Sequence, residues 1–436
     1  MRKQFSTLSL KFRDYFLDRR KLSPVLLGVV GVFSLSIFGS YVGLHLKDIG
    51  TTQIVIGVIL AMRNIYQLFL RVPLSDFSQK VGRKPLLFSG LFCYSLALFT
   101  LFLANHWILV FVATTLIALG MSSFWPALIS YIADVEKDDV GKLQGKTFQG
   151  TDLGSILGSL VAYLLIKLLK LPLQNLFGIT ALASFIAGIF LFFYVPESLD
   201  VTIRGDTQSK IRGLFVSFKS MFSSLAIVSK QKNLMIVYFY QIVLAFLEYF
   251  MTAFFPFLIT TSVELGGKGM PYETVALIMW INSGVLIFFK PLFGRVIDKF
   301  GFKLPITITL SICALTIWSL VIVNSLFVIV MIYLIYSAAT LTSYIATNSE
   351  TTRRAKVAQR GLAVGALGFY LSAGRSLSTL VLSPVWRNLG IIPLFKIAAC
   401  VVAIFIVILF ILTWVVNPTK KSAGINKKTL VDEPKT

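Results

Sequence analysis

The strongest constraint on the fold of this chain is a series of twelve apolar runs, separated by short polar segments. A membrane-spanning helix needs about 20 consecutive, mostly apolar residues. The runs cover residues 24–46, 52–74, 86–105, 107–132, 146–168, 174–195, 233–259, 273–296, 304–324, 326–348, 361–385 and 391–416. Several connections are very short, so neighbouring helices are expected to run antiparallel. We therefore predict an all-α membrane protein with twelve transmembrane helices.

Composition agrees with a lipid environment and excludes several other classes. Of the 436 residues, 56% are hydrophobic and 14% are charged, whereas soluble domains carry about 25% charged residues. The three cysteines, Cys93, Cys313 and Cys400, lie far apart within apolar runs, which indicates inert buried thiols. Neither histidine has metal-ligand spacing. The sequence contains no nucleotide-binding motif, and we expect no cofactor, no metal and no enzyme activity.

The basic residues predict the orientation in the membrane. Loops on the cytoplasmic side carry an excess of Lys and Arg. If the N-terminus lies inside, the inner segments hold 31 of the 41 Lys and Arg residues and the outer loops hold six. The remaining four are Arg63, Arg71, Lys290 and Arg375, within or near the ends of runs. This distribution also explains the net charge of +22 without a nucleic-acid partner. We expect both termini in the cytoplasm and the protein in the plasma membrane.

The chain also shows an internal duplication. The basic segment 71–85 follows the second apolar run, and a second version at 290–303 follows the eighth. Ser-Tyr-Ile-Ala likewise occurs at 130–133 and at 343–346. We predict five parts. They are a cytoplasmic amphipathic segment (1–23), a six-helix half (24–195), a cytoplasmic linker with an amphipathic helix (196–232), a second six-helix half (233–416) and a polar, disordered cytoplasmic tail (417–436).

The segment 71–85 resembles the loop between the second and third helices of the major facilitator superfamily, Gly-x-x-x-Asp-Arg/Lys-x-Gly-Arg-Arg/Lys. Gly82, Arg83 and Lys84 match it, and Asp134 stands where the family has an acid that pairs with the arginine. The resemblance covers nearly the whole chain. It implies two parallel halves that rock about a site near the membrane midplane, with this loop as a cytoplasmic latch.

This copy of the loop departs from the family pattern at two positions. Ser75 replaces the glycine and Gln79 replaces the aspartate, with Asp76 one turn earlier. Either Asp76 substitutes, or the second copy, with Gly294 and Asp298, carries more of the latch. The alternative is that Arg83 and Lys84 only anchor the loop to the inner membrane surface.

A further pair of charges suggests a cytoplasmic gate. Asp152 and Lys290 lie at similar depths, and the resemblance implies that their helices pack across the interface between the halves. We expect the two to approach each other when the cavity opens outward. The alternative is that Lys290 reaches the headgroups and that Asp152 bonds locally. Gly368 stands where the first half has Asp152, so Arg71 lacks a matching partner.

Ionisable residues within spans are costly, and they usually face a cavity or a partner. Arg63 and Arg375 lie near the middle of their runs and would form a positive zone that suits a carboxylate or phosphate. Alternatively, each arginine is a structural tie to backbone carbonyls or to an acid on its own helix. Glu248 is the candidate for carrying a coupled proton, or else an inert carboxylate near the outer interface. Four further candidates follow from helices that line the cavity in the resembled family: Trp125, Tyr240, Gln241 and Tyr336.

We therefore expect a monomeric secondary transporter of a small solute, with lipid, the solute and protons as partners. Export of an amphipathic or drug-like compound is the leading hypothesis. Uptake or exchange of an organic anion is the alternative, favoured by Arg63 and Arg375. A non-transporting scaffold or receptor with a transporter fold is the alternative from another class, and charged residues within the spans argue against it.

Overall fold

A computed structural model of the protein describes residues 18–136, 140–198, 231–355 and 360–411. These residues form twelve long α-helices, one short 3-10 helix (η2, Val263–Leu265) and no strand. The first six helices are α2 (Arg19–Asp48), α3 (Gln53–Val81), α4 (Arg83–Phe102), α5 (Trp107–Val135), α6 (Val140–Lys167) and α7 (Leu173–Tyr194). The last six are α9 (Lys232–Thr260), α10 (Tyr272–Phe300), α11 (Lys303–Ile322), α12 (Leu326–Arg354), α13 (Arg360–Leu389) and α14 (Ile391–Phe410).

Each predicted span corresponds to one of these helices. Eleven of them are long and apolar enough to cross a membrane, and the twelfth, α13, has spanning length but carries Arg375 and several serines. The predicted all-α membrane class is confirmed. The first helix begins at Arg19, earlier than expected, because the Asp18 carboxylate accepts a hydrogen bond from the Arg20 amide and caps it. The rest of the N-terminal segment, most of the linker and the tail lie outside the described residues.

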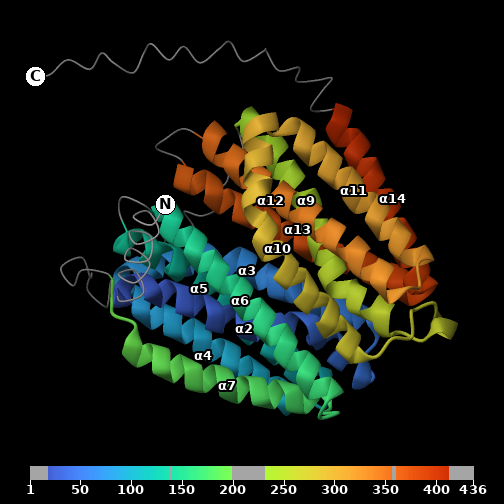
Figure 1. The fold of residues 1–436 in the computed structure, drawn as a ribbon, viewed down its shortest axis with the longest axis horizontal. Helices are drawn as coiled ribbons and strands as arrows, with labels where there is room; N and C mark the ends of the chain where they lie inside the picture. Colours follow the sequence, from blue (N-terminus) through green and yellow to red (C-terminus); the bar gives the residue numbers. More distant parts are fainter. Residues whose placement is uncertain (1–17, 137–139, 199–230, 356–359, 412–436) are drawn as a thin grey trace, which may run out of the picture.

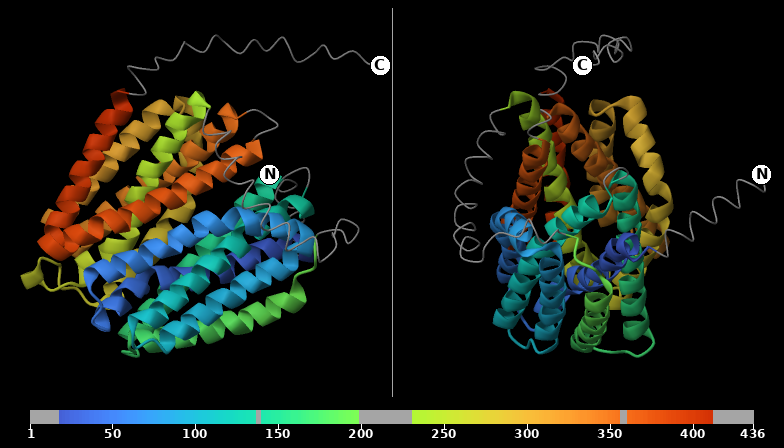
Figure 2. Two further views of the ribbon diagram at one scale, coloured as in Figure 1. Left: turned by 180° about the vertical axis from the view of Figure 1, so that it is seen from behind. Right: turned by 90° about the vertical axis from the view of Figure 1, so that its left-hand side faces the viewer.

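The helices form two halves with matching internal contacts (Figures 1 and 2). In the first half α2 packs on α6, α4 on α5, α3 on α5 and α4 on α7. In the second half the corresponding pairs are α9 with α13, α11 with α12, α10 with α12 and α11 with α14. The halves meet chiefly where α3 packs on α13 and α6 packs on α10. This pairing is the one that a duplicated six-helix unit is expected to give.

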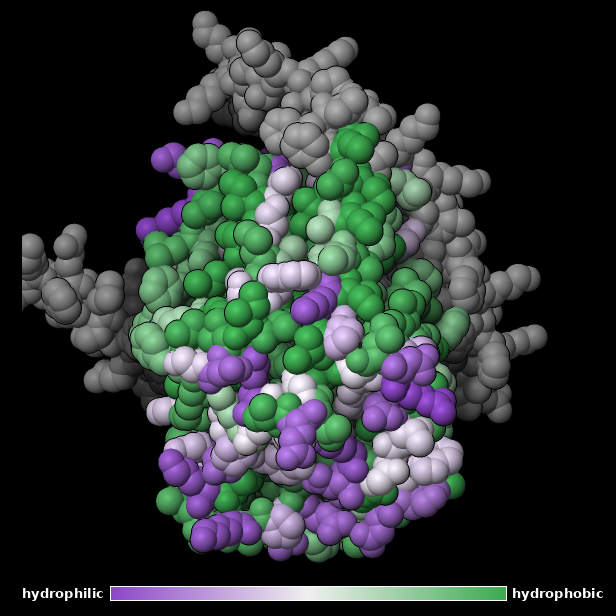
Figure 3. Space-filling model, turned by 90° about the vertical axis from the view of Figure 1, so that its right-hand side faces the viewer, coloured by the Kyte–Doolittle hydropathy of each residue, from purple (hydrophilic) through white to green (hydrophobic). Residues whose placement is uncertain are grey.

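Large apolar side chains point outward over much of the surface. Phe193 is 74% exposed and Phe288 is 79% exposed, which is the reverse of a soluble protein and suits contact with lipid tails. Figure 3 shows hydrophobic residues over most of the upper part of one end of the bundle, with hydrophilic residues across its lower half.

A line of glycines brings α6 unusually close to α2. A Cβ atom added at Gly150 would lie 2.5 Å from the Val25 carbonyl oxygen, and one at Gly154 would lie 2.2 Å from that of Val29. At Gly158 it would lie 2.1 Å from the Ser36 hydroxyl oxygen. The Gly-x-x-x-Gly spacing gives α6 a face of small residues, and this face forms a backbone-to-backbone contact with α2.

The two ends of the bundle differ in how the halves meet. We name the end where α2 begins and α14 ends the terminal end, and the other the opposite end. At the opposite end the Lys47 ammonium donates to the Thr261 hydroxyl (3.2 Å), and the Tyr41 hydroxyl donates to the Tyr272 carbonyl (3.3 Å). A Cβ added at Gly57 of α3 would lie 1.6 Å from the Ser383 hydroxyl oxygen of α13. The halves are thus in close contact at the opposite end.

Candidate functional site

Two connected hollows lie between the halves. The larger has a volume of about 230 Å³ and is lined by residues of α2, α6, α9, α10 and α12, among them Ser155, Asn282 and Tyr333. A small neighbouring pocket reaches Arg63 and Tyr249. Gly39, Ser40 and Thr252 line both. The site therefore joins a hydroxyl-rich wall to one buried arginine, with elements of both halves contributing.

An ion pair joins α9 to α13 near the middle of the second half. One terminal nitrogen of Arg375 donates to both carboxylate oxygens of Glu248, at 2.7 and 2.9 Å. The Glu248 side chain is 39% exposed although its helix is mostly buried within the bundle. The carboxylate is therefore paired but not fully enclosed by protein. Of the two arginines expected to form a positive zone, Arg375 is thus paired with Glu248.

Arg63 is held differently. Its residue is only 9% exposed, and its guanidinium carbon lies 5.1 Å from the Tyr249 ring centre and 5.8 Å from that of Phe38. Such stacking stabilises a cation, but it does not involve hydrogen bonds from the guanidinium N–H groups. The Nε atom has no hydrogen-bond partner. Within the described residues Arg63 makes no ion pair.

The helix pairs between the halves carry two contrasting contacts. Lys290 of α10 forms an ion pair with Asp152 of α6, and the Ser155 and Ser283 hydroxyls meet nearby at 2.9 Å. In the matching pair, the Arg71 guanidinium of α3 lies over Gly368 of α13, where an added Cβ would be 3.0 Å from its nearest nitrogen. One interface therefore has a charge pair, and its counterpart has an arginine over a glycine.

The sequence linked the Asp152–Lys290 contact to an outward-open cavity. Here the contact coexists with close contacts at the opposite end, which is the predicted outer side. Both sets of contacts are present together in this structure. The ion pair is therefore not a signature of outward opening alone.

The loop that follows α3 is tied into its own half. Gly82 adopts a φ of 117°, in the region that favours glycine. The Arg83 guanidinium donates to Asp134 (3.0 Å) and to Ser78 (2.8 Å). Sequence reasoning missed Glu197, whose carboxylate accepts from the amides of Arg83 (3.0 Å) and Lys84 (3.3 Å) and so caps α4. The side chains of Asp76, Gln79, Gly294 and Asp298 lie outside the described part.

The remaining candidates are mostly packing residues. The Gln241 side-chain oxygen accepts from the Thr347 hydroxyl (2.7 Å), and Gln241 is fully buried. Tyr240 packs edge-on against Phe302, and Trp125 against Phe124. Tyr336 is buried beside Tyr333, and its hydroxyl has no hydrogen-bond partner. None of the four lines either central hollow.

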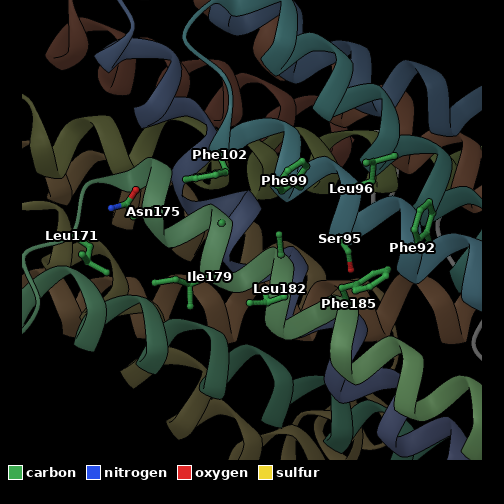
Figure 4. A pocket seen from close by; sticks show the side chains of 12 residues that line it. Phe92, Ser95, Leu96, Phe99, Phe102, Leu171, Asn175, Ile179, Leu182 and Phe185 are labelled. Carbon is green, nitrogen blue, oxygen red and sulfur yellow. The ribbon is translucent and has the colours of Figure 1, made fainter.

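A larger hollow lies away from this site, on the flank of the first half. A groove of about 660 Å³ runs along α4 and α7, lined almost wholly by apolar side chains such as Phe92, Phe99 and Phe185 (Figure 4). It offers no ionisable group. The smaller central hollows, which contain the charged and hydroxyl groups, are therefore the better candidates for binding a polar solute.

Comparison with known proteins agrees with this arrangement. Solved structures with the same fold include the peptide transporter POT in complex with sulfate (TM-score 0.72, 14% identity, 90% of this chain and 94% of that one). Another is a mutant of the nucleoside transporter NupG (TM-score 0.73, 15% identity, 90% and 100%). The multidrug resistance protein MdtH of Blochmanniella floridana is 26% identical over 219 residues. The match covers 49% of this chain and about half (53%) of the length of that protein.

The family assignment rests on the longest match. Residues 25–379 match the family model of the Major Facilitator Superfamily, which covers eleven of the twelve long helices in whole or in part. The two solved structures named above are transporters with the same fold. The chain therefore belongs to the Major Facilitator Superfamily, and it is a membrane transporter, not an enzyme.

Proposed function

We propose that this protein couples the export of a small amphipathic solute to the movement of protons. The observation that carries this proposal is the Glu248–Arg375 ion pair, which lies within the spans and whose carboxylate is partly exposed. Protonation of Glu248 removes its negative charge and with it the charge-assisted hydrogen bonds to Arg375. The two protonation states then differ in the contacts between α9 and α13, and this difference can bias an equilibrium between two conformations.

Export is the direction that the likeness to a multidrug resistance protein supports. The mixture of aromatic and hydroxyl groups around the central hollows suits a solute with an apolar body and polar ends. Uptake or exchange of an organic anion is the second candidate, favoured by Arg63, which makes no ion pair within the described residues. A non-transporting scaffold would have no use for ion pairs inside its spans.

The test uses purified protein in liposomes that contain a pH-sensitive dye. Under an imposed pH gradient, adding a transported solute should speed the collapse of the gradient, and liposomes without protein should not respond. A panel of amphipathic cations, neutral compounds and carboxylates identifies the solute. Solute flux that leaves the dye unchanged would contradict proton coupling, while transport itself would stand.

We further propose that the terminal end faces the cytoplasm, that the protein lies in the plasma membrane, and that it works as a monomer. A single cysteine replacing Ser209, in an otherwise cysteine-free protein, is expected to resist a membrane-impermeant maleimide in intact cells and to react after permeabilisation. A cysteine replacing Glu264, at the opposite end, should react in intact cells. Labelling in the reverse order would contradict this orientation.

The Asp152–Lys290 pair is proposed to hold the terminal end closed. Spin labels on the two halves at that end report the open fraction. We expect Asp152→Asn and Lys290→Gln each to raise that fraction, with a coupling of about 1–2 kcal/mol in a double-mutant cycle, since the pair is partly exposed. The matched control is Lys21–Glu136, which has similar exposure but joins α2 to the residue just after α5, within one half. Additive effects at Asp152 and Lys290 would remove the pair from the gate.

A further inference from the structure

The space between the halves holds more positive than negative charge. Arg63, Arg71, Lys290 and Arg375 lie there, together with the carboxylates Asp152 and Glu248. Both carboxylates are already engaged, with Lys290 and with Arg375. Arg63 and Arg71 therefore remain without an ion pair among the described residues. Both lie on α3 and are separated by about two turns, roughly 12 Å along the helix.

The surroundings of Arg63 leave a place for an anion. Its Nε atom is a buried donor without a hydrogen-bond partner. The guanidinium stacks between Phe38 and Tyr249, which fixes its plane and leaves its edge as the polar contact surface. This edge lines the small pocket that shares Ser40 with the larger hollow.

Arg71 lies closer to the terminal end and is also short of a counter-charge. Its guanidinium covers Gly368, and it lies within electrostatic range of Tyr344 and of Arg375. Tyr344 is 43% exposed, so solvent reaches this region. The Glu248 carboxylate is not available to Arg71, because it is already bonded to Arg375.

We infer that the transported solute carries an acidic oxygen group, a carboxylate or a phosphate, which binds to the edge of the Arg63 guanidinium, with Arg71 as a second cation on the way to the terminal end. Isolated buried charges are costly unless they are paired. A planar guanidinium matches an oxygen acid with two parallel hydrogen bonds. This inference rests on the proposed transport of an amphipathic solute and specifies the charge of that solute.

Binding measurements test the inference without any pH gradient. Full-length protein in phosphatidylcholine nanodiscs is titrated by calorimetry with three probes that share an aromatic body: 1-naphthoate, 1-naphthylmethanol and 1-naphthylmethylamine. We expect naphthoate to bind about tenfold or more tightly than the other two, the size of effect that a charge-assisted hydrogen bond gives. Arg63→Gln should remove this preference, and Arg71→Gln should weaken naphthoate binding.

Lys396→Gln is the control, because Lys396 is an exposed cation on α14, outside the site. It should leave all three affinities unchanged. Equal affinity for the three probes, or an unchanged preference in Arg63→Gln, would overturn the inference. If Arg63→Gln does not give a monodisperse protein, the ranking of the probes by the unmodified protein and the effect of Arg71→Gln decide the question.

Two further arms separate the possible origins of a negative result. Glu248→Gln should still bind naphthoate, so loss of proton coupling and loss of anion binding are distinguishable. Nanodiscs with half of the lipid replaced by phosphatidylglycerol test for a lipid phosphate at the same site. Unchanged naphthoate binding in those discs supports a soluble solute, whereas its loss would overturn the assignment of the site to the transported molecule.

Discussion

Replacing Glu248 with glutamine is expected to abolish accumulation driven by a pH gradient, reducing it to the level measured without a gradient. Glutamine keeps the shape of the side chain and can still accept a hydrogen bond from Arg375, but it cannot take up or release a proton at neutral pH. Exchange of labelled for unlabelled solute needs no net proton movement and should persist. The measurement is uptake into liposomes of a solute found with the pH-dye screen, with and without the gradient.

Glu264→Gln is the matched control for this experiment, because Glu264 is an exposed carboxylate in η2 at the opposite end. It should accumulate solute like the unmodified protein. Normal gradient-driven accumulation by Glu248→Gln would remove Glu248 from the coupling mechanism. Loss of both accumulation and exchange would instead assign to Glu248 a role in binding or folding.

The second large effect is expected at Gly57. Valine at this position would overlap the Ser383 side chain and the Thr379 carbonyl of α13. The Thr379 carbonyl belongs to the helix backbone and cannot rotate out of the way. Overpacking of this kind costs about 1–3 kcal/mol, which corresponds to roughly a ten- to hundredfold shift between two conformations. We expect the opposite end to be held apart and transport to fall by a similar factor.

Spin labels at Thr51 and Leu265, one in each half at the opposite end, measure this separation directly. Their distance distribution should shift to longer values in Gly57→Val. Gly188→Val on α7 is the control, since a Cβ added there meets no atom within 4 Å. An unchanged distance together with undiminished transport would mean that the tight contact between α3 and α13 is not needed for the cycle.

Hydrophobicity and spacing were sufficient to predict the fold. A bilayer demands long apolar helices, so the run lengths alone predicted the helices that the structure contains. The spacing of Gly150, Gly154 and Gly158 is typical of a close helix contact, and the structure identifies α2 as the partner. The comparison of the two halves predicted that Arg71 would lack a matching acid, and it lies over Gly368. These features depend on local sequence or on register, which can be read directly.

The pairing of charges could not be predicted in the same way. Glu248 and Arg375 are 127 residues apart in sequence, and their contact depends on the rotation of α9 and α13 about their own axes. Apolar helices that are hydrophobic all round do not reveal that rotation. For the same reason Tyr240 and Gln241 were candidates for the cavity, yet both are packed within the second half. The role of Glu197 as a cap could not be predicted either, because it depends on the position of the segment after α7 relative to the start of α4.

The glycine contact between α2 and α6 has a mechanical consequence. The two backbones touch at three successive turns. Neither helix can therefore slide or rotate without the other, and the two helices move as one rigid unit. Asp152 lies on α6 of this rigid unit. Ser40 of α2 and Ser155 of α6, which line the larger hollow, belong to the same unit. A motion that separates Asp152 from Lys290 would therefore move α2 and α6 together, with the hydroxyl groups of Ser40 and Ser155 at a fixed spacing. The solute would be released because the α2–α6 pair moves away from the second half. The spacing of the hydroxyl groups that bound the solute would stay unchanged for the next cycle.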